Sequence, residues 1–243
     1  MQNIFDNEIF FDGYKAIRER EANANVLFEI PALLSMMPDL RGKRVLDLGC
    51  GFGEHCKMFV DRGAERVVGI DISEKMLEVA VRENSHPKIE YRRMPIEDID
   101  RLSESFDVAV SSLALHYIED FVGVTEKVYR LLAPSGVFVF SQEHPLVTSH
   151  SGGSRWTKNE NGEKLHVNIS NYGIEGERET EWFIGGIKIY HRTFSSIVNT
   201  LIKVGFTLEG MTEPLPTPDL LEKYPEHRDL FHKPDFLLIK ARK

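Results

Sequence analysis

Short apolar runs alternate with amphipathic helical patterns along most of the chain. Residues 45–48, 67–72, 106–111 and 137–141 are apolar runs of strand length, and a shorter strand is expected at 89–92. The stretches between them repeat their apolar positions every three to four residues, which is typical of helices that pack on a sheet. Strands and helices that alternate in this way predict an α/β fold with a doubly wound, mostly parallel sheet.

The N-terminal part of the chain precedes this alternation. A helical pattern runs from Tyr14 to Ile30, and Pro31 opens a second short helix that Pro38 closes. We therefore expect residues 1–40 to form a helical cap on the domain.

After the fifth strand the pattern changes. About fifty residues, 145–192, intervene before a helix that opens at Thr193. Residues 149–162 are rich in Gly, Ser and Asn and predict a mobile loop. The later part alternates apolar and polar positions, which predicts a β-hairpin or a small antiparallel sheet.

Two further strands are expected near the C-terminus. The runs at 207–211 and 236–239 have strand character, and the segment between them, 214–234, is proline-rich and is expected to be a loop.

Composition limits the classes of partner. The chain has 243 residues, 42% of them hydrophobic, and a formal net charge of −8. Proteins that bind nucleic-acid backbone usually carry a basic face, so this balance disfavours a nucleic-acid partner. Cys50 and Cys56 are the only cysteines, and their spacing does not suggest a structural disulfide. With no signal-peptide pattern and no apolar run long enough to span a bilayer, we expect a cytoplasmic protein with no membrane partner.

The most informative stretch is VLDLGCGFGEH at residues 45–55. An apolar strand leads into glycines at alternate positions, Gly49, Gly51 and Gly53, and a helix follows. A strand, a tight glycine turn and a helix N-terminus form a cradle for a nucleotide-like ligand. The third glycine comes one residue too early for a dinucleotide fingerprint, and the Lys and Ser/Thr of a P-loop are absent.

A second acidic strand end supports this interpretation. Asp71 ends the strand at 67–72 and follows Gly53 by 71 − 53 = 18 residues, which places its carboxylate beside the glycine turn in a βαβ unit. A carboxylate can accept both hydroxyls of a ribose. The alternative is that Asp71 caps the next helix, but Ser73 followed by Glu74 already supplies a cap.

Together these residues resemble motif I and the acidic second-strand end of the class I S-adenosylmethionine-dependent methyltransferases. The fourth-strand segment 106–118 is also similar to that family, and the resemblance covers about residues 41–141. It implies one domain over 1–243, with a seven-stranded sheet of order 3-2-1-4-5-7-6 whose last strand is antiparallel. Residues 145–192 would then be a β-rich insertion after strand 5.

The resemblance implies S-adenosylmethionine as cofactor, S-adenosylhomocysteine as product, and no metal. In many relatives an N-terminal helix covers the cofactor, so Tyr14 or Arg18 would meet the methionine carboxylate, with an ordinary surface pair as the alternative. Met94 stands where many members carry Asp, which leaves Ile96 and Glu97 as the expected adenine contacts. The full set of expected cofactor residues is Tyr14, Arg18, Asp47, Gly49, Cys50, Gly51, Gly53, Asp71, Ile72, Met76, Pro95, Ile96, Glu97, Ser112 and Leu113.

Three histidines are candidates for a general base, which would assist methyl transfer to a hydroxyl or an amine. His116 follows the fourth strand, His144 the fifth, and His191 lies where the insertion returns to the core. The alternatives are packing beside the cofactor for His116 and local helix capping for His191. We interpret residues 145–192 as a lid, with a structural flap or a dimer contact as the alternative.

The sequence thus predicts methyl transfer to a small molecule, with O-, N- or C-methylation left open. The Asn-Pro-Pro-aromatic motif of amino-directed nucleic-acid methyltransferases is absent after the fourth strand, where Ser111, Ser112 and Leu113 stand instead. A protein that binds S-adenosylmethionine or S-adenosylhomocysteine without transferring a methyl group is one alternative. A nicotinamide-dependent oxidoreductase is a weaker one, and a homodimer is left open.

Overall fold

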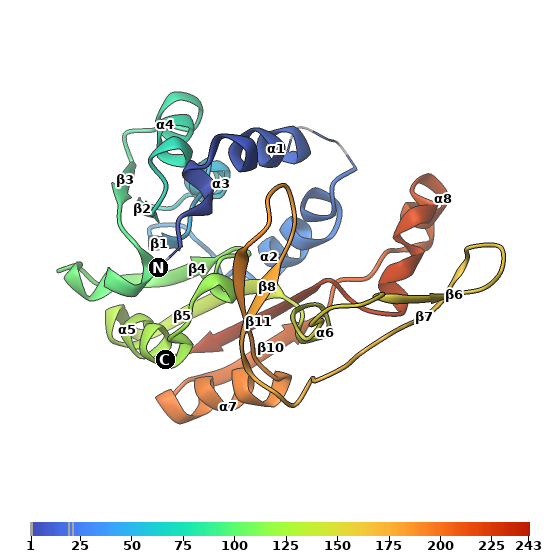
Figure 1. Cartoon of the computed structure of the whole chain (residues 1–243). Coiled ribbons are helices and arrows are strands. Elements are labelled where there is room, and N and C mark those ends of the chain that lie inside the picture. The colour runs from blue at the N-terminus through green and yellow to red at the C-terminus, as the bar shows by residue number, and fades with distance from the viewer. Residues whose placement is uncertain (1, 19, 21) are drawn as a thin grey trace.

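A computed structural model describes residues 2–18, 20 and 22–243. Its strands and helices alternate around one large sheet (Figure 1). The strands of this sheet are β1 (Arg44–Leu48), β2 (Arg66–Asp71), β3 (Ile89–Arg93), β4 (Phe106–Ser111), β5 (Leu132–Glu143), β10 (Thr207–Thr212) and β11 (Phe236–Arg242). The helices that connect or flank them are α2 (Ile30–Met36), α3 (Glu54–Asp61), α4 (Glu74–Glu83), α5 (Phe121–Leu131) and α7 (Phe194–Val204), with short 3-10 turns η3 (Ile96–Arg101) and η4 (Leu115–Tyr117).

The strand order confirms the sequence prediction. It is β3-β2-β1-β4-β5-β11-β10, which equals 3-2-1-4-5-7-6 when the strands of this sheet are numbered along the chain. The first five strands pair in parallel, and β11 runs antiparallel to both β5 and β10. The carboxyl ends of the five parallel strands therefore lie at one edge of the sheet, where ligands bind in open α/β sheets.

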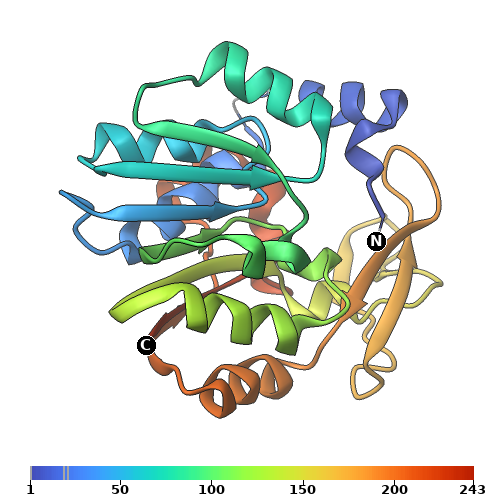
Figure 2. The same cartoon turned by 90° about the vertical axis from the view of Figure 1, so that its left-hand side faces the viewer.

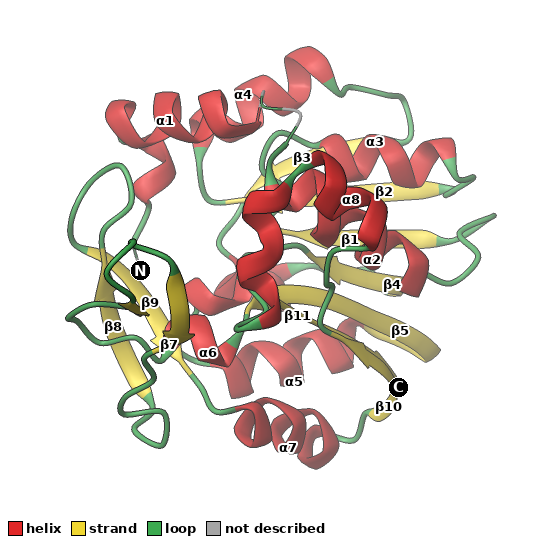
Figure 3. Ribbon diagram, turned by 90° about the vertical axis from the view of Figure 1, so that its right-hand side faces the viewer, coloured by secondary structure: helices red, strands yellow, loops and turns green. Residues whose placement is uncertain are grey.

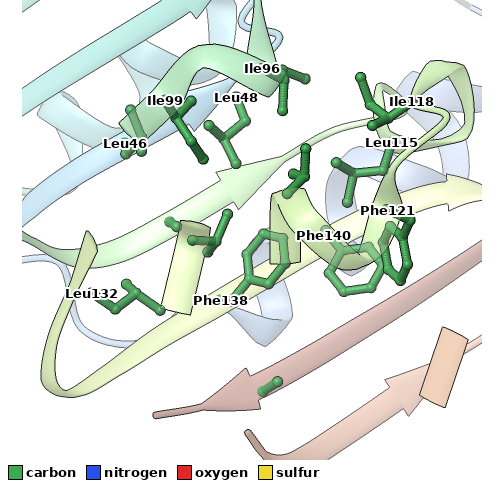
Figure 4. Packing of buried hydrophobic residues seen from close by; sticks show 14 of the residues in the cluster. Leu46, Leu48, Ile96, Ile99, Leu115, Ile118, Phe121, Leu132, Phe138 and Phe140 are labelled. Atoms are coloured by element: carbon green, nitrogen blue, oxygen red, sulfur yellow. The ribbon is translucent and has the colours of Figure 1, made fainter. Parts of the chain in front are cut away.

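Side chains alternate between the two faces of the sheet along each strand, so a separate hydrophobic core forms on each face. On β1, Leu46 and Leu48 face α5, η3 and α7, whereas Val45 faces α2 and α3. Figure 4 shows the first core, where Phe138 and Phe140 of β5 pack with Phe121 and Leu115. Helices cover both faces of the sheet, as Figure 3 shows, and the near-complete burial of these apolar side chains is the main source of stability.

The N-terminal cap differs from the expected continuous pattern. Its first helix, α1 (Glu8–Arg18), begins six residues before Tyr14 because Asn7 Oδ1 accepts the backbone N–H of Phe10 at 3.1 Å and caps it. A separate π-helical turn, η2 (Asn25–Glu29), follows and leads into α2, with Asn23 Oδ1 accepting the N–H of Val26. The prediction of one helical run to Ile30 is therefore wrong, whereas the short helix opened by Pro31 is confirmed.

The insertion contains a short helix and two separate hairpins. These are α6 (Pro145–Thr148), then β6 (Trp156–Lys158) with β7 (Lys164–Val167), then β8 (Gly176–Thr180) with β9 (Ile187–His191). The predicted antiparallel β structure is present, but residues 149–162 include β6 rather than forming only a loop. The β6–β7 hairpin extends toward α8 (Pro218–Lys223), as Figure 1 shows. Lys164 of β7 forms an ion pair with Asp229, which lies in the 3-10 segment that follows α8.

The proline-rich segment is also more ordered than predicted. Residues 214–234 contain α8 and a 3-10 segment, η5 (Pro225–Phe231), rather than a loop alone. Thr217 caps α8 by accepting the N–H of Leu220, and Pro218 stands in the first helical turn, where a missing N–H costs nothing.

The N-terminal segment and the β8–β9 hairpin form a common roof over the carboxyl edge of the sheet. We define this roof as residues 2–18 and 176–191, and Figure 2 shows both parts beside each other at that edge. The Gln2 side chain joins them, because it donates to Gly186 O and accepts from Lys188 N, both at 2.8 Å. A small apolar core shared by the two parts consists of Ile4, Phe10, Ile187 and Ile189.

Candidate active site

A cavity of about 270 Å³ lies beneath the roof and against the turn that follows β1. We call it the glycine-loop cavity. A second pocket of about 460 Å³, the β3-side pocket, adjoins it, because both are lined by Phe5, Asp71, Ala114 and Tyr117. The glycine-loop cavity is lined by Phe5, Tyr14, Arg18, Asn25, Gly49, Cys50, Gly51, Phe52, Glu54, His55, Asp71, Met76, Ser112, Leu113, Ala114, His116, Tyr117, Glu143, Trp182 and Phe236.

Most of the predicted cofactor residues meet in these two spaces. Ile72, Pro95, Ile96 and Glu97 line the β3-side pocket, and the predicted residues from α1, the glycine turn, α4 and the β4 exit line the glycine-loop cavity. Asp47 of β1 and Gly53, which precedes α3, are not among the lining residues.

The glycines of the turn have two different functions. Gly49 and Gly51 have φ of +75° and +52°, values that side chains rarely adopt. A Cβ on Gly49 would lie 2.7 Å from the Cβ of Ala114, so that glycine permits close packing of the chain itself. A Cβ on Gly51 would have no protein atom within 4 Å, although Gly51 lines the cavity. Gly51 therefore leaves open the space that a ligand would fill.

Asp71 connects the strand end to the turn. Its Oδ2 accepts the N–H of Gly51 at 2.9 Å, and its Oδ1 accepts the N–H of Ser73 at 2.8 Å. The side chain of Ser73 accepts the N–H of Met76 and caps α4, as the sequence predicts. Because a carboxylate offers about four acceptor sites, Asp71 retains capacity for a ligand in both spaces that it lines.

Two fully buried carboxylates lie near the turn, and each has an oxygen with no partner among the described residues. Asp47 Oδ2 accepts the Cys56 thiol at 3.2 Å, whereas its Oδ1 has no hydrogen bond. Burial raises the pKa of Asp47 to about 7, and the charges of Asp71 and Glu29 add to this rise. Glu29 Oε2 is likewise unpaired, and burial raises the pKa of Glu29. Such unpaired atoms are costly and point to a missing partner.

Glu29 also holds the chain where it leaves β4. Its Oε1 accepts the hydroxyls of Ser112 and Ser141, and the Ser141 hydroxyl in turn accepts the N–H of Leu113 at 3.0 Å. Leu113 has φ of +51°, which is unusual for a bulky residue and persists only where the surroundings enforce it. This network turns Ser112, Leu113 and Ala114 toward the cavity that they line.

His116 lines the cavity, but its environment disfavours proton uptake. Its Nδ1 accepts the backbone N–H of Glu143 at 3.4 Å, so the neutral ring carries its proton on Nε2. Burial lowers the pKa of His116 to about 3, and the positive charge of Arg192 acts in the same direction. A ring in this state donates a hydrogen bond more readily than it accepts a proton.

The structure places His144 and His191 outside both spaces. His144 Nδ1 accepts the N–H of Leu146 at 3.1 Å, and its Nε2 lies 2.8 Å from Glu213 Oε1. The ring of His191 is fully buried between Thr148 Oγ1 and the carbonyl of Tyr172, each at 2.8 Å. Both rings make hydrogen bonds within the fold, and neither lines the two spaces.

Sequence reasoning missed Glu143, although it lies beside His144 in the QEHP stretch. Glu143 ends β5 opposite Phe236 of β11, and both residues line the cavity. Burial raises the pKa of Glu143 to about 7. The available signal was its position, because a carboxylate at the carboxyl end of a parallel strand faces the edge where ligands bind.

None of the helices in the described ranges has the length and apolar character that crossing a membrane requires. Within the same ranges, no group of three or more His, Cys, Asp or Glu side chains could hold a metal ion.

Comparison with known proteins assigns the family. A family model described as a methyltransferase domain matches residues 46–140. A solved structure described as an S-adenosylmethionine-dependent methyltransferase from Listeria monocytogenes is 42% identical, with a TM-score of 0.82 over 88% of this chain and 96% of that one. Another, from Mesorhizobium loti, is 38% identical, with a TM-score of 0.80 over 92% and 99%. The chain belongs to the S-adenosylmethionine-dependent methyltransferases. 

This methyltransferase is also similar to curated enzymes over shorter segments. A ubiquinone biosynthesis O-methyltransferase from Neisseria meningitidis is 37% identical over 42% of this chain and 45% of its own length. The likeness to the two solved structures, over 88% and 92% of this chain, confirms the predicted fold and class of enzyme. The acceptor is not identified by a match of less than half of either chain.

Proposed function

We propose that this methyltransferase transfers the methyl group of S-adenosylmethionine to a small molecule held beneath the roof. One observation carries the proposal. The glycine-loop cavity is lined by the glycine turn and Asp71 on one side, and by Glu143, Tyr117 and Trp182 from other elements. Residues suited to a cofactor and residues suited to an acceptor therefore share one covered space.

The lining fits the nucleoside part of the cofactor. We assign the ribose hydroxyls to Asp71, which lies where the two spaces adjoin. The adenine is assigned to the β3-side pocket, with Ile96 packing on the ring and Glu97 or its backbone at the ring edge. Gly51 supplies the open surface against which the ligand would lie.

Ionisable groups near the glycine turn are suited to the methionine part of the cofactor. S-Adenosylmethionine carries a sulfonium and an ammonium group. The buried carboxyl groups of Asp47 and Glu29 near the turn each have an oxygen without a partner, and a bound cation would favour their ionised form. Arg18 and Tyr14 line the same cavity from α1, and Arg18 forms an ion pair with Glu54 at the start of α3. We assign the methionine carboxylate to Arg18 and to the free N–H groups at that helix end.

The cofactor supplies an electrophilic methyl group, so the protein has to align an acceptor and exclude water. Alignment of two reactants can contribute roughly 7–11 kcal/mol to a barrier reduction. The roof would exclude water from the reacting groups, because its aromatic residues Phe5, Tyr14 and Trp182 line the cavity.

The proposal is tested by incubating the protein with methyl-labelled S-adenosylmethionine and a metabolite extract. The expected result is labelled small-molecule product together with S-adenosylhomocysteine. Tight cofactor binding with no labelled product would favour a binding protein instead. A nicotinamide cofactor that co-purifies and is reduced or oxidised would favour the oxidoreductase alternative.

A further inference from the structure

We propose that Glu143 receives the acceptor and that the acceptor is an amine. This inference rests on the proposed function and names the class of its substrate. Glu143 is a carboxylate in the cavity wall that has no role in the proposed binding of the cofactor.

The position of Glu143 is fixed by the fold while its carboxylate stays free. Its backbone N–H donates to His116 Nδ1 at 3.4 Å, and the antiparallel register sets it opposite Phe236. Among the described residues, none donates a hydrogen bond to its side chain. A carboxylate that is held in a cavity wall without a donor is suited to accept from a ligand.

The other charges of the cavity favour a cationic or neutral acceptor over an anionic one. Arg18 is the one cationic side chain among the described lining residues, and it already pairs with Glu54. Behind Glu143, the charges of Arg155, Lys233 and Asp235 act on it, and Lys233 is paired with Asp235. A carboxylate acceptor would therefore meet Glu143 as a like charge.

Aromatic side chains share the lining of the cavity with Glu143. Phe5 stands at right angles to both Tyr14 and Tyr117, with ring centres 5.6 and 5.9 Å away. Trp182 of the roof stands at right angles to Tyr14 at 6.1 Å. Ring faces of this kind attract ammonium groups, most strongly where water is excluded.

The acidity of Glu143 matches the chemistry of an amine. Burial raises its pKa to about 7, so both forms of the group are accessible near neutral pH. The carboxylate form can pair with an ammonium group, and it becomes the acid form when it accepts a proton from that group. His116 cannot fill this role, because burial lowers its pKa to about 3.

The reaction then balances in the following way. An ammonium acceptor pairs with the Glu143 carboxylate and gives it one proton, which leaves a neutral nitrogen with a lone pair. That lone pair forms the N–CH₃ bond as the S–CH₃ bond breaks, and the electron pair of the broken bond stays on sulfur. The products are a methylated ammonium, a neutral thioether and a protonated Glu143, which returns its proton to solvent when the product leaves.

The test measures binding rather than turnover. The full-length protein is saturated with S-adenosylhomocysteine and titrated by calorimetry at pH 8. The ligands are matched amines, alcohols and carboxylates on several aromatic and aliphatic carbon skeletons, starting with 2-phenylethylamine, 2-phenylethanol and 3-phenylpropionate. For at least one carbon skeleton, the amine should bind at least tenfold more tightly than the alcohol and the carboxylate. In the variant Glu143→Gln, the ratio of amine affinity to alcohol or acid affinity should fall by at least tenfold.

Controls separate this inference from the proposed function. Glu143→Gln should retain its affinity for S-adenosylhomocysteine within twofold, which also shows that it folds. Glu213→Gln removes a carboxylate outside the cavity and should retain the amine preference. If no amine binds better than its matched alcohol and acid, or if Glu143→Gln leaves amine binding unchanged, the inference is overturned. If S-adenosylhomocysteine fails to bind the wild-type protein, the proposed function fails first.

Discussion

Asp71 has a structural role in the turn, and we propose that it also binds the ligand. It closes the turn through Gly51 and Ser73 while lining both spaces. If it also accepts the ribose hydroxyls, Asp71→Ala should weaken S-adenosylhomocysteine binding by about 1.5–3 kcal/mol, because hydrogen bonds to charged groups have that strength. Asp71→Asn keeps an acceptor oxygen and should lose less. Calorimetry that shows unchanged affinity for Asp71→Ala would contradict the ribose assignment.

Gly51 offers a sharper test, because the chain contains a matched control. Gly42 also has a left-handed backbone, with φ of +68°, and a Cβ there also meets no atom within 4 Å, but Gly42 does not line the cavity. Valine at either position should cost about 1–3 kcal/mol of folding free energy through backbone strain. Only Gly51→Val should abolish cofactor binding, because its side chain enters the ligand space. Equal cofactor affinities for the two folded variants would contradict this account.

At this scale the sequence predicted the residues that line the cavity better around the glycine turn than at the end of β5. Motif spacing led to Gly51 and Asp71, because a βαβ unit fixes where those residues meet. Residue type led to His144 and His191, because imidazole is the usual base near neutral pH. A sequence does not reveal that both rings are held by local partners, nor that burial brings the pKa of Glu143 to about 7.

At the scale of elements, the insertion contributes to the cavity through one of its two hairpins. Trp182, in the loop between β8 and β9, lines the cavity, whereas Trp156 of β6 packs against His232 and beneath Lys164, outside it. The sequence located the β-rich segment but not this division, because alternating apolar positions predict strands without showing where each hairpin packs. The lid hypothesis therefore applies to β8–β9 together with the N-terminal segment that Gln2 joins to it.

These two tryptophans test the roof. Trp182→Ala should reduce methyl transfer by about tenfold or more, since a poorly covered and misaligned acceptor loses much of the benefit of orientation. Its affinity for S-adenosylhomocysteine should change by less than about threefold, which is under 1 kcal/mol. Trp156→Ala should leave both quantities close to wild type. Steady-state rates that fall equally in the two variants would assign the effect to general destabilisation rather than to covering the cavity.

Predictions of helices from local sequence signals alone were less accurate than the prediction of the sheet. The start of α1 and the presence of α8 both depend on capping side chains, Asn7 and Thr217, which the spacing of apolar residues does not indicate. The sheet was predicted well because its order follows from apolar strands, crossover helices and the family resemblance, all of which act over many residues.

At the scale of the whole molecule, buried acids make stability depend on pH. Asp71 and Glu29 lie close enough to Asp47 for their negative charges to raise its pKa. Burial is the main reason that the pKa of Asp47 rises from 3.8 to about 7. Between these two values the folded protein keeps a proton that the unfolded chain has lost. The stability provided by this group is therefore fully present below about pH 4 and is lost as the pH rises through 7.

In the protein without cofactor, Asp47 should lower the free energy of unfolding by about 2 kcal/mol between pH 5.5 and 8, since one pKa unit corresponds to about 1.4 kcal/mol. Asp47→Asn should remove that part of the decline, and urea unfolding at the two pH values measures the difference. The cationic cofactor should reverse the trend by favouring the ionised carboxylate, so its affinity should rise from pH 6 to 8 in wild type and less in Asp47→Asn. Parallel pH profiles for the two proteins, with and without cofactor, would mean that Asp47 does not titrate in this range and is not the partner of the cofactor's positive charge.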